Sequence, residues 1–186
     1  MKKIISVFLS VIMLVTSLCF AVSANASVNK KSGEYDYTFV SADKIAIKEY
    51  TGSESIVNIP SKIDGFTVTE ISGAFNVMDN LKKVVIPSTV TTISASFEYD
   101  SNLAEVTIPS SVKTIDYNSF CKNTALKSIV IPSSVTRLDA FQDCTSLTSI
   151  KIGDNISDIS AYAFAESPVY ENQYKKGIVY IGKCLL

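Results

Sequence analysis

Hydrophobic residues recur along this chain in one pattern that repeats at nearly equal intervals. Each copy begins with Leu, has Val or Ile three residues later and Ile five residues later, and ends with Pro or Gly. The copies occupy residues 81–87, 103–109, 126–132 and 147–153, so successive leucines are almost evenly spaced. A fixed spacing of this kind is typical of a solenoid, in which each repeat forms one turn that stacks on the previous turn.

The pattern continues beyond the Pro or Gly of each copy. A Val or Ile lies four residues after the last Ile of the motif, and an Ile or Leu follows at seven residues. Phenylalanine then closes each unit at Phe75, Phe97, Phe120, Phe141 and Phe164. Six apolar anchors per turn predict one continuous core with the phenylalanines as its spine. Leu103, Leu126 and Leu147 should then form a column.

The first half of each repeat predicts a short strand. Side chains alternate across a strand, so the Val and Ile of the motif share the inner face and the residue between them points outward. Neighbouring copies should pair as parallel strands. The Pro that follows has no N–H to donate and is tolerated where a strand ends.

The segments on either side of the repeats predict different structure. In 27–55, Tyr35, Tyr37 and Phe39 alternate with polar residues, as do Ile45 and Ile47, which predicts a β-hairpin that caps the first turn. We assign 56–167 to the solenoid. Residues 168–186 are expected to be strand-like, and their apolar end suggests continuation into a missing repeat or domain, although a dimer could also cover that end.

Residues 1–26 read as a targeting segment. Lys2 and Lys3 precede an apolar stretch over 4–22, and the Ala-Asn-Ala of 24–26 matches a cleavage site. This is the pattern of a secretory signal peptide, and an uncleaved membrane anchor is the alternative. Cleavage would give a secreted, extracellular or cell-surface protein without membrane insertion.

The repeats resemble those of the BspA-like bacterial leucine-rich repeat proteins, whose motif is close to L-x-x-V-x-I-P-x-x-V-x-x-I-x-x-x-A-F-x-x-C-x-x-L. Residues 103–126 and 126–147 match it with few departures, and the likeness extends over about 56–164. Cys144 occupies the cysteine position, where Asp100 and Asn123 stand in two other repeats.

The resemblance implies a leucine-rich-repeat solenoid that is mainly β, of the α/β horseshoe class, with a parallel sheet of short strands and an N-terminal β-hairpin cap. It also implies a protein whose relatives adhere to host or neighbouring cells, or serve as recognition modules of larger secreted proteins.

Composition narrows the possible chemistry. The 186 residues include no His and no Trp, and their 17 basic and 18 acidic side chains nearly balance. Without His, Ser-His-Asp triads, Cys-His nucleophiles and His-ligated metals are excluded. No pair of carboxylates can be placed for catalysis, and there is no strong positive charge for nucleic acid. We therefore predict no enzymatic activity, no cofactor, no metal site and no nucleic-acid partner.

Three cysteines, Cys121, Cys144 and Cys184, would remain after signal cleavage. An odd number allows at most one disulfide pair, and their spacing does not suit a metal site. We interpret them as buried thiols that act as small apolar residues.

The outward positions of the strands are the candidate contact surface for a protein partner. These positions form two rows: Lys83, Glu105, Ser128 and Ser149, and then Val85, Thr107, Val130 and Lys151. They contain no aromatic row for sugars and no arginine cluster for phosphate. The sequence thus predicts a non-catalytic recognition module. Two alternatives stay open: an ordinary solvated sheet face, and a spacer or targeting arm of a larger secreted protein.

Overall fold

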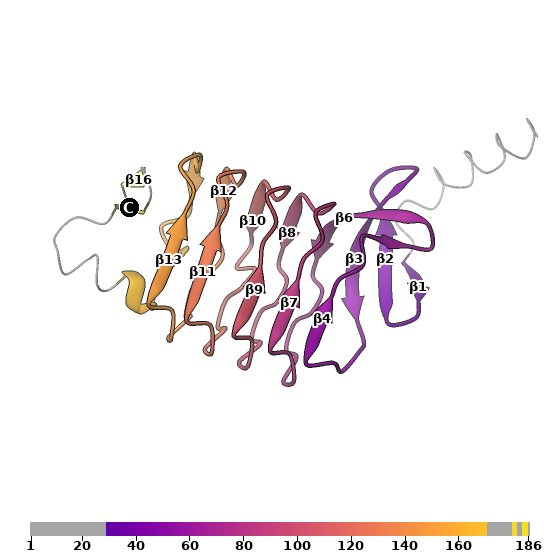
Figure 1. Cartoon of the computed structure of the whole chain (residues 1–186), viewed down its shortest axis with the longest axis horizontal. Helices are drawn as coiled ribbons and strands as arrows, with labels where there is room; N and C mark the ends of the chain where they lie inside the picture. Colours follow the sequence, from indigo (N-terminus) through magenta and orange to yellow (C-terminus); the bar gives the residue numbers. More distant parts are fainter. Residues whose placement is uncertain (1–28, 171–179, 182–183, 186) are drawn as a thin grey trace, which may run out of the picture.

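The chain winds into an elongated solenoid whose turns stack side by side (Figure 1). The structure is a computed structural model and describes residues 29–170, 180–181 and 184–185. Each complete turn contributes one strand to each of two parallel layers. The layer nearer the viewer in Figure 1, called here the front sheet, contains β4 (Ile56–Asn58), β7 (Lys83–Val85), β9 (Glu105–Thr107), β11 (Ser128–Ile131) and β13 (Ser149–Ile152).

The opposite layer, called here the back sheet, is continuous from the N-terminal hairpin to the last described turn. Its strands are, in order, β1 (Lys30–Ser32), β2 (Tyr35–Phe39), β3 (Lys44–Tyr50), β6 (Phe66–Ser72), β8 (Thr92–Ser94), β10 (Thr114–Asp116), β12 (Arg137–Leu138) and β14 (Asp158–Ile159), and β5 (Lys62–Ile63) pairs with β6 outside this order. From β3 to β14 neighbouring strands are parallel. The sequence pattern predicted only the front strands, because two apolar anchors three residues apart do not show the alternation of a strand.

The front strands form at the predicted positions, and most of them pair as expected. β7 lies parallel to β4 and β9, with Lys83 opposite Glu105, and β11 lies parallel to β13, with Ser128 opposite Ser149. The exception is β9 and β11, which do not pair, so the front sheet is divided into two parts.

The interior confirms the predicted core. All four motif leucines and the four phenylalanines from Phe97 to Phe164 have no exposed surface. The Phe rings stack in one column, with centroids 5.1 Å apart between Phe75 and Phe97, 5.2 Å between Phe97 and Phe120, 5.3 Å between Phe120 and Phe141, and 5.6 Å between Phe141 and Phe164. Because each ring is buried by rings of the neighbouring turns, stability depends on the stack and not on any single turn.

The N-terminal end of the column is covered by the β2–β3 hairpin. The Tyr50 ring stacks on Phe75 at 4.9 Å, and the Tyr35 ring contacts both. β5 (Lys62–Ile63) pairs antiparallel with β6, and the turn between them bonds to β1 and β2. In this turn, Asp64 accepts hydrogen bonds from Ser32 and from the Tyr37 hydroxyl, and burial together with this bond raises the pKa of Tyr37 to about 12.

A buried polar ladder occupies the cysteine position of the repeats. Asp100 Oδ1 accepts the N–H of Met78 at 2.6 Å, and Asn123 Oδ1 accepts the N–H of Asp100 at 3.1 Å. Cys144 Sγ donates to the carbonyl of Phe120 at 3.1 Å. Each side chain therefore satisfies backbone groups of the preceding turn. Cys121 and Cys144 are buried free thiols, as expected, and the side chain of Cys184 lies outside the described part of the structure.

The chain reverses direction at the same place in every turn. The residue two positions after each Phe has a positive φ, between 58° and 62°, although none of the five is glycine. These residues are Val77, Tyr99, Lys122, Asp143 and Glu166. The left-handed conformation costs an L-residue about 1 kcal/mol or more, so the stacked turns impose it on these positions.

Gly153 ends β13 where the other repeats have Pro. Its N–H donates to the carbonyl of Ile131 at 2.9 Å, a bond that proline could not make. A Cβ at this position would lie 2.3 Å from the Cα of Ser133 in the preceding turn.

We predict that Gly153→Ala lowers the free energy of unfolding by about 1–3 kcal/mol, because the methyl group must displace backbone. Urea unfolding followed by circular dichroism would measure the loss, with Asp154→Ala, an exposed neighbour, as the control. Equal stability of Gly153→Ala and the wild type would contradict the close approach of these two turns.

The C-terminal segment, expected to be strand-like, begins with a helical turn at 168–170. The short strands β15 (Tyr180–Ile181) and β16 (Cys184–Leu185) pair antiparallel. The predicted signal peptide, 1–26, lies outside the described residues.

Candidate functional site

The front sheet brings together the residues predicted to contact a partner. In the register of the strands, Lys83 lies opposite Glu105 and Val85 opposite Thr107. Beyond the break, the pairs are Ser128 with Ser149 and Val130 with Lys151. The two rows therefore exist as expected, interrupted once between β9 and β11.

Charge along these rows is sparse and mostly positive. Lys83 Nζ lies 2.7 Å from Glu105 Oε2, and both side chains are well exposed. A solvent-exposed ion pair of this kind contributes little to stability, so both groups remain available to a partner. Lys82, Lys127 and Lys151 are exposed and make no ion pair with any residue that the structure describes.

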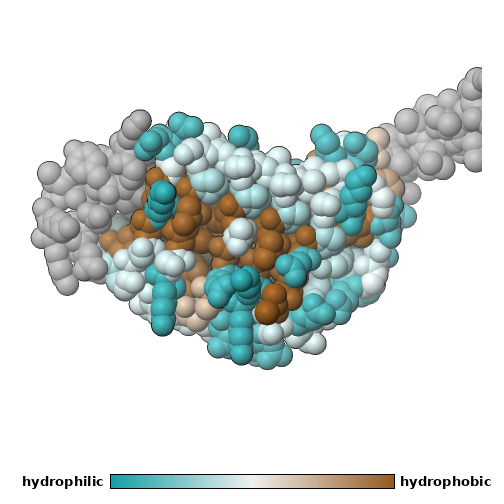
Figure 2. Space-filling view, viewed as in Figure 1, coloured by the Kyte–Doolittle hydropathy of each residue, from teal (hydrophilic) through white to brown (hydrophobic). Residues whose placement is uncertain are grey.

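Apolar side chains are exposed on the same face. Figure 2, drawn in the view of Figure 1, shows hydrophobic residues gathered in a band across the front sheet, with hydrophilic residues above and below it. Ile56 and Val130 are 53% and 59% exposed. Half-buried members of the front strands and their ends add to the band: Val85, Val106, Ile108, Ile150 and Ile152. Contiguous exposed apolar surface with a polar rim is typical of interaction sites.

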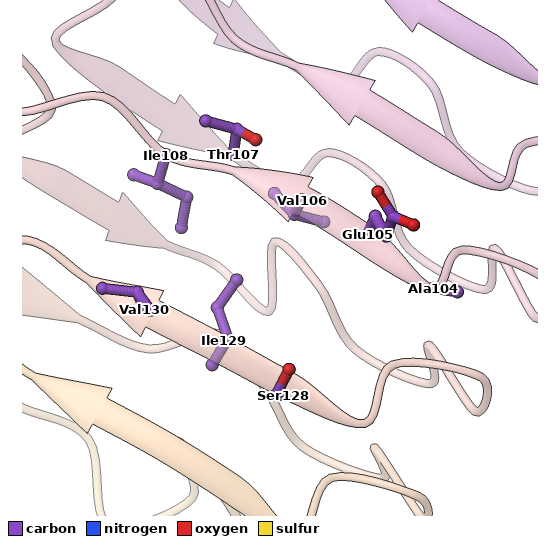
Figure 3. Close-up of a pocket in the computed structure, with 8 residues that line it drawn as sticks. All are labelled: Ala104, Glu105, Val106, Thr107, Ile108, Ser128, Ile129 and Val130. Atoms are coloured by element: carbon purple, nitrogen blue, oxygen red, sulfur yellow. The ribbon is translucent and has the colours of Figure 1, made fainter.

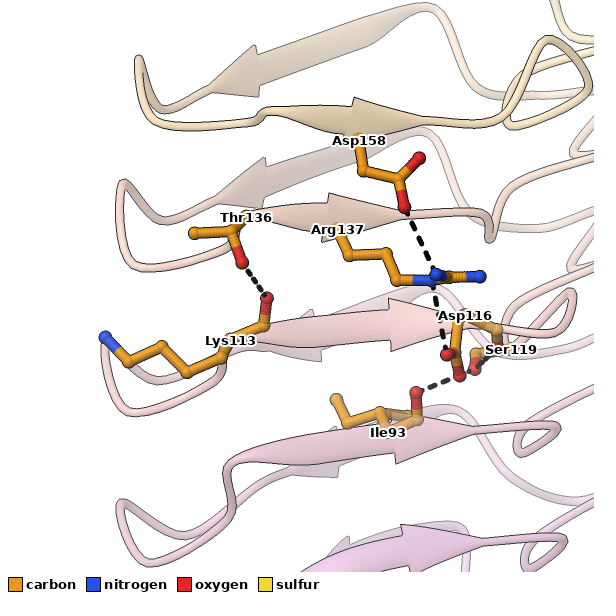
Figure 4. A network of polar contacts seen from close by, with 7 residues as sticks. All are labelled: Ile93, Lys113, Asp116, Ser119, Thr136, Arg137 and Asp158. Atoms are coloured by element: carbon orange, nitrogen blue, oxygen red, sulfur yellow. Dashed lines mark hydrogen bonds and ion pairs between the residues drawn. The ribbon is translucent and has the colours of Figure 1, made fainter.

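The back sheet differs because polar residues flank the buried anchors of its later strands. Arg137 lies between two carboxylates, with Nε 3.5 Å from Asp116 Oδ2 and Nη1 3.2 Å from Asp158 Oδ2 (Figure 4). On the same sheet, the Thr136 hydroxyl donates to the carbonyl of Lys113 at 3.3 Å. Exposed lysines without an ion pair among the described residues occur on both sheets, Lys113 being one on the back. The sheets differ in their apolar surface, because β8, β10, β12 and β14 place polar residues beside their buried anchors and the front sheet exposes apolar ones.

A groove of about 450 Å³ lies at the break between β9 and β11 (Figure 3). Its lining residues are Ala104, Glu105, Val106, Thr107, Ile108, Ser128, Ile129 and Val130. In Figure 3 the side chains of Ile108 and Ile129 reach into the space between the two strands. Four of the lining residues were not predicted as site residues: Ala104, Val106, Ile108 and Ile129. The repeat pattern places Val106, Ile108 and Ile129 in the interior, as it does the matching residues of the other turns.

The described residues lack two further features, a metal site and a membrane-spanning helix. They contain no group of three or more His, Cys, Asp or Glu side chains placed to hold a metal ion. None of the helical structure among them is long and apolar enough to cross a membrane.

The strands of successive turns are parallel, and each complete turn contributes one buried motif leucine. These features define the class of leucine-rich-repeat solenoids. The sequence model of the BspA type leucine-rich repeat region matches residues 69–185 in six copies, and the chain belongs to this family. A search of curated proteins finds no match.

Solved structures of bacterial leucine-rich repeat proteins share the fold. The chain is 29% identical to the leucine-rich repeat protein of T. pallidum, with a TM-score of 0.68 over 76% of this chain and 68% of that one. A leucine-rich cell surface protein of Faecalibacterium prausnitzii gives 24% identity and a TM-score of 0.59, over 79% of this chain and 48% of its own length. A leucine-rich repeat protein from Bacteroides capillosus gives 22% identity and a TM-score of 0.58, over 67% of this chain and 97% of its own.

Proposed function

We propose that this protein is a secreted or cell-surface recognition module that binds a protein partner through the front sheet and carries out no catalysis. The observation that carries the proposal is the difference between the two sheets of one solenoid. The later strands of the back sheet expose polar residues, with Arg137 between two carboxylates, whereas the front sheet exposes an apolar band with lysines beside it. A rigid repeat array with one such face is suited to extended contact with another protein.

One structural neighbour and the leader sequence support the proposed location. The neighbour from F. prausnitzii is a leucine-rich cell surface protein. The Lys2–Lys3 start, the apolar stretch and the Ala-Asn-Ala site of the leader also agree with export. A partner on the surface of another cell would meet the front sheet without a membrane between them.

We predict that the front-sheet double variant Lys127→Glu/Lys151→Glu weakens adhesion by about tenfold or more, because reversed charges repel the partner that the wild-type lysines attract. Adhesion would be measured with protein-coated particles on bacterial and animal cells, before and after protease treatment of the cell surface. The matched control is Lys62→Glu/Lys113→Glu, which changes the net charge equally at exposed back-sheet positions.

Both variants should unfold at the wild-type temperature, since all four side chains are exposed. Equal loss in the two variants would show an effect of net charge and not of the front sheet. Wild-type adhesion by both would favour the alternative role of a spacer or targeting arm, and adhesion that survives protease treatment would exclude a protein partner.

A further inference from the structure

Where the front sheet breaks, the backbone N–H and C=O groups of β9 and β11 do not hydrogen-bond to each other. In the closed parts of the sheet, the N–H groups of Ala104 and Glu105 both donate to the carbonyl of Lys82. Likewise, those of Thr148 and Ser149 donate to the carbonyl of Lys127. Among the described residues, the equivalent bonds from β11 to the carbonyl of Ala104 are missing, and no hydrogen bond joins β9 to β11.

The break is confined to the front of one turn. On the back sheet the same two turns stay paired, with Thr114 opposite Arg137 and Ile115 opposite Leu138. The turn that begins at Leu103 is also the longest of the three when turns are measured from leucine to leucine. Its extra length lies around Tyr117 and Asn118, which both have positive φ. The opening is therefore a local feature of one repeat, and the strands on either side of it remain in register with their neighbours.

The groove at the break has the dimensions and lining of a peptide site. It follows β9 from Ala104 to Ile108, and five extended residues span about 17 Å. Its volume of about 450 Å³ falls within the range of small-ligand sites. Apolar side chains from both strands line it, and the backbone groups of the open strand edges border it. Some Cα atoms of β9 and β11 lie within 8 Å of each other, too close for a strand to enter between them at about 4.8 Å from each. A bound extended segment therefore lies over the groove and contacts it mainly through its side chains.

The one charged residue that lines the groove, Glu105, is ion-paired to Lys83, and the front sheet around the groove is positively charged. Residues 29–170 carry 12 basic and 17 acidic side chains. The front strands and the residue before each contribute Lys82, Lys83, Lys127, Lys151 and Glu105. The remaining residues of this range hold 8 basic and 16 acidic groups, so a local excess of positive charge lies on an otherwise acidic protein. Such a face attracts carboxylates.

The geometry points to the groove between β9 and β11 as the docking site for an extended segment of the partner protein that carries carboxylates beside apolar side chains. This inference rests on the proposed function and adds to it the class of segment that is bound. A sulfated polysaccharide would satisfy the lysines, but it would leave the apolar lining unused.

The test uses capped, fluorescently labelled eight-residue peptides in which Val alternates with Glu, Lys or Ser. Binding to the whole protein would be measured by fluorescence anisotropy. We expect the Glu peptide to bind at least about tenfold more tightly than the Lys peptide, with the Ser peptide between them. In amide NMR spectra, the Glu peptide should shift the signals of Ala104, Lys127 and Ser128.

The register provides a matched pair of variants. Ser128 and Ser149 are both exposed and lie opposite each other on β11 and β13, but only Ser128 lines the groove. Ser128→Tyr should fill the groove and weaken binding of the Glu peptide by about tenfold or more, whereas Ser149→Tyr should change it less than about threefold. Tyrosine is a good strand residue, so both variants should fold.

The outcomes separate the groove from the front sheet as a whole. Equal affinity of the two tyrosine variants, or preference for the Lys peptide, would overturn the docking site. If cell adhesion were lost in Lys127→Glu/Lys151→Glu but kept in Ser128→Tyr, the front sheet would still be the contact surface and the groove would not. Binding of heparin with no binding of any peptide would assign the lysines to a polysaccharide and overturn the inference.

Discussion

Replacing Phe120 by alanine should lower the free energy of unfolding by about 3–5 kcal/mol, the largest stability effect that we predict for a single side chain. Phe120 has no exposed surface and stands near the middle of the ring column. Its centroid lies 5.2 Å from that of Phe97 and 5.3 Å from that of Phe141. The substitution removes the buried ring, leaves a cavity and takes one stacking partner from each neighbouring turn.

The effect should be cooperative along the solenoid, since the turns on either side lose contacts as well. Urea unfolding followed by far-ultraviolet circular dichroism would measure it. Tyr117→Ala is the control, because this aromatic residue lies three positions away in the same turn but is 65% exposed; its loss should cost less than about 0.5 kcal/mol. A cost for Phe120→Ala no larger than that of this control would mean that the turns do not share one core.

Asp100→Asn should raise stability at neutral and alkaline pH. Asp100 is completely buried, and its Oδ2 atom has no hydrogen-bond partner among the described residues. Burial, assisted by the nearby Asp79 carboxylate and opposed by the N–H of Met78, raises the pKa of Asp100 from 3.8 to about 7. In the next turn, Asn123 fills this position and its Nδ2 donates to the carbonyl of Phe97 at 3.0 Å. Asparagine at position 100 can use the equivalent carbonyl of Phe75.

The direction of the pH effect follows from the raised pKa. Below about pH 4 the carboxyl is protonated in both the folded and the unfolded state, so it does not affect their balance. Between about pH 4 and 7 the unfolded state loses this proton and the folded state retains it, and stability falls as the pH rises. We expect Asp100→Asn to exceed the wild type by about 2–4 kcal/mol at pH 8 and to approach it at pH 4.

Urea unfolding at pH 4, 6 and 8 would measure this difference, with Asp154→Asn, an exposed carboxyl, as the control for the general effect of charge. A pH-independent difference between Asp100→Asn and the wild type would show that the carboxyl has the same pKa in the folded and unfolded states and would contradict this prediction.

Several features could be predicted from the residues alone, because they depend on spacing. The motif leucines and the phenylalanines recur at nearly constant intervals, and side chains at equal intervals return to the same side of a stacked turn. The alternation of Tyr35, Tyr37 and Phe39 likewise predicted the first strand of the hairpin. The outward residues of the front strands follow from the same argument, since they alternate with buried anchors.

Other features depend on contacts between turns and leave no trace in the spacing. The second strand of each turn forms because neighbouring backbones come within hydrogen-bonding distance, although Thr92, Thr114 and Arg137 share no strand-like alternation. Asp100 could be seen as a departure from the cysteine position, but its burial depends on the turns on both sides of it. Val106 and Ile108 occupy the same motif positions as Val84 and Ile86. Val84 and Ile86 are buried, whereas Val106 and Ile108 are partly exposed because β11 does not pair with β9.

The amino-acid sequence by itself therefore determined the class of fold, the core and the face on which variable residues gather, since periodic apolar positions can be buried together only when the turns stack. The tertiary structure decided where that face is open, which polar groups remain without partners and how the two sheets differ. Those properties arise from the fit between successive turns, which the repeat pattern does not record.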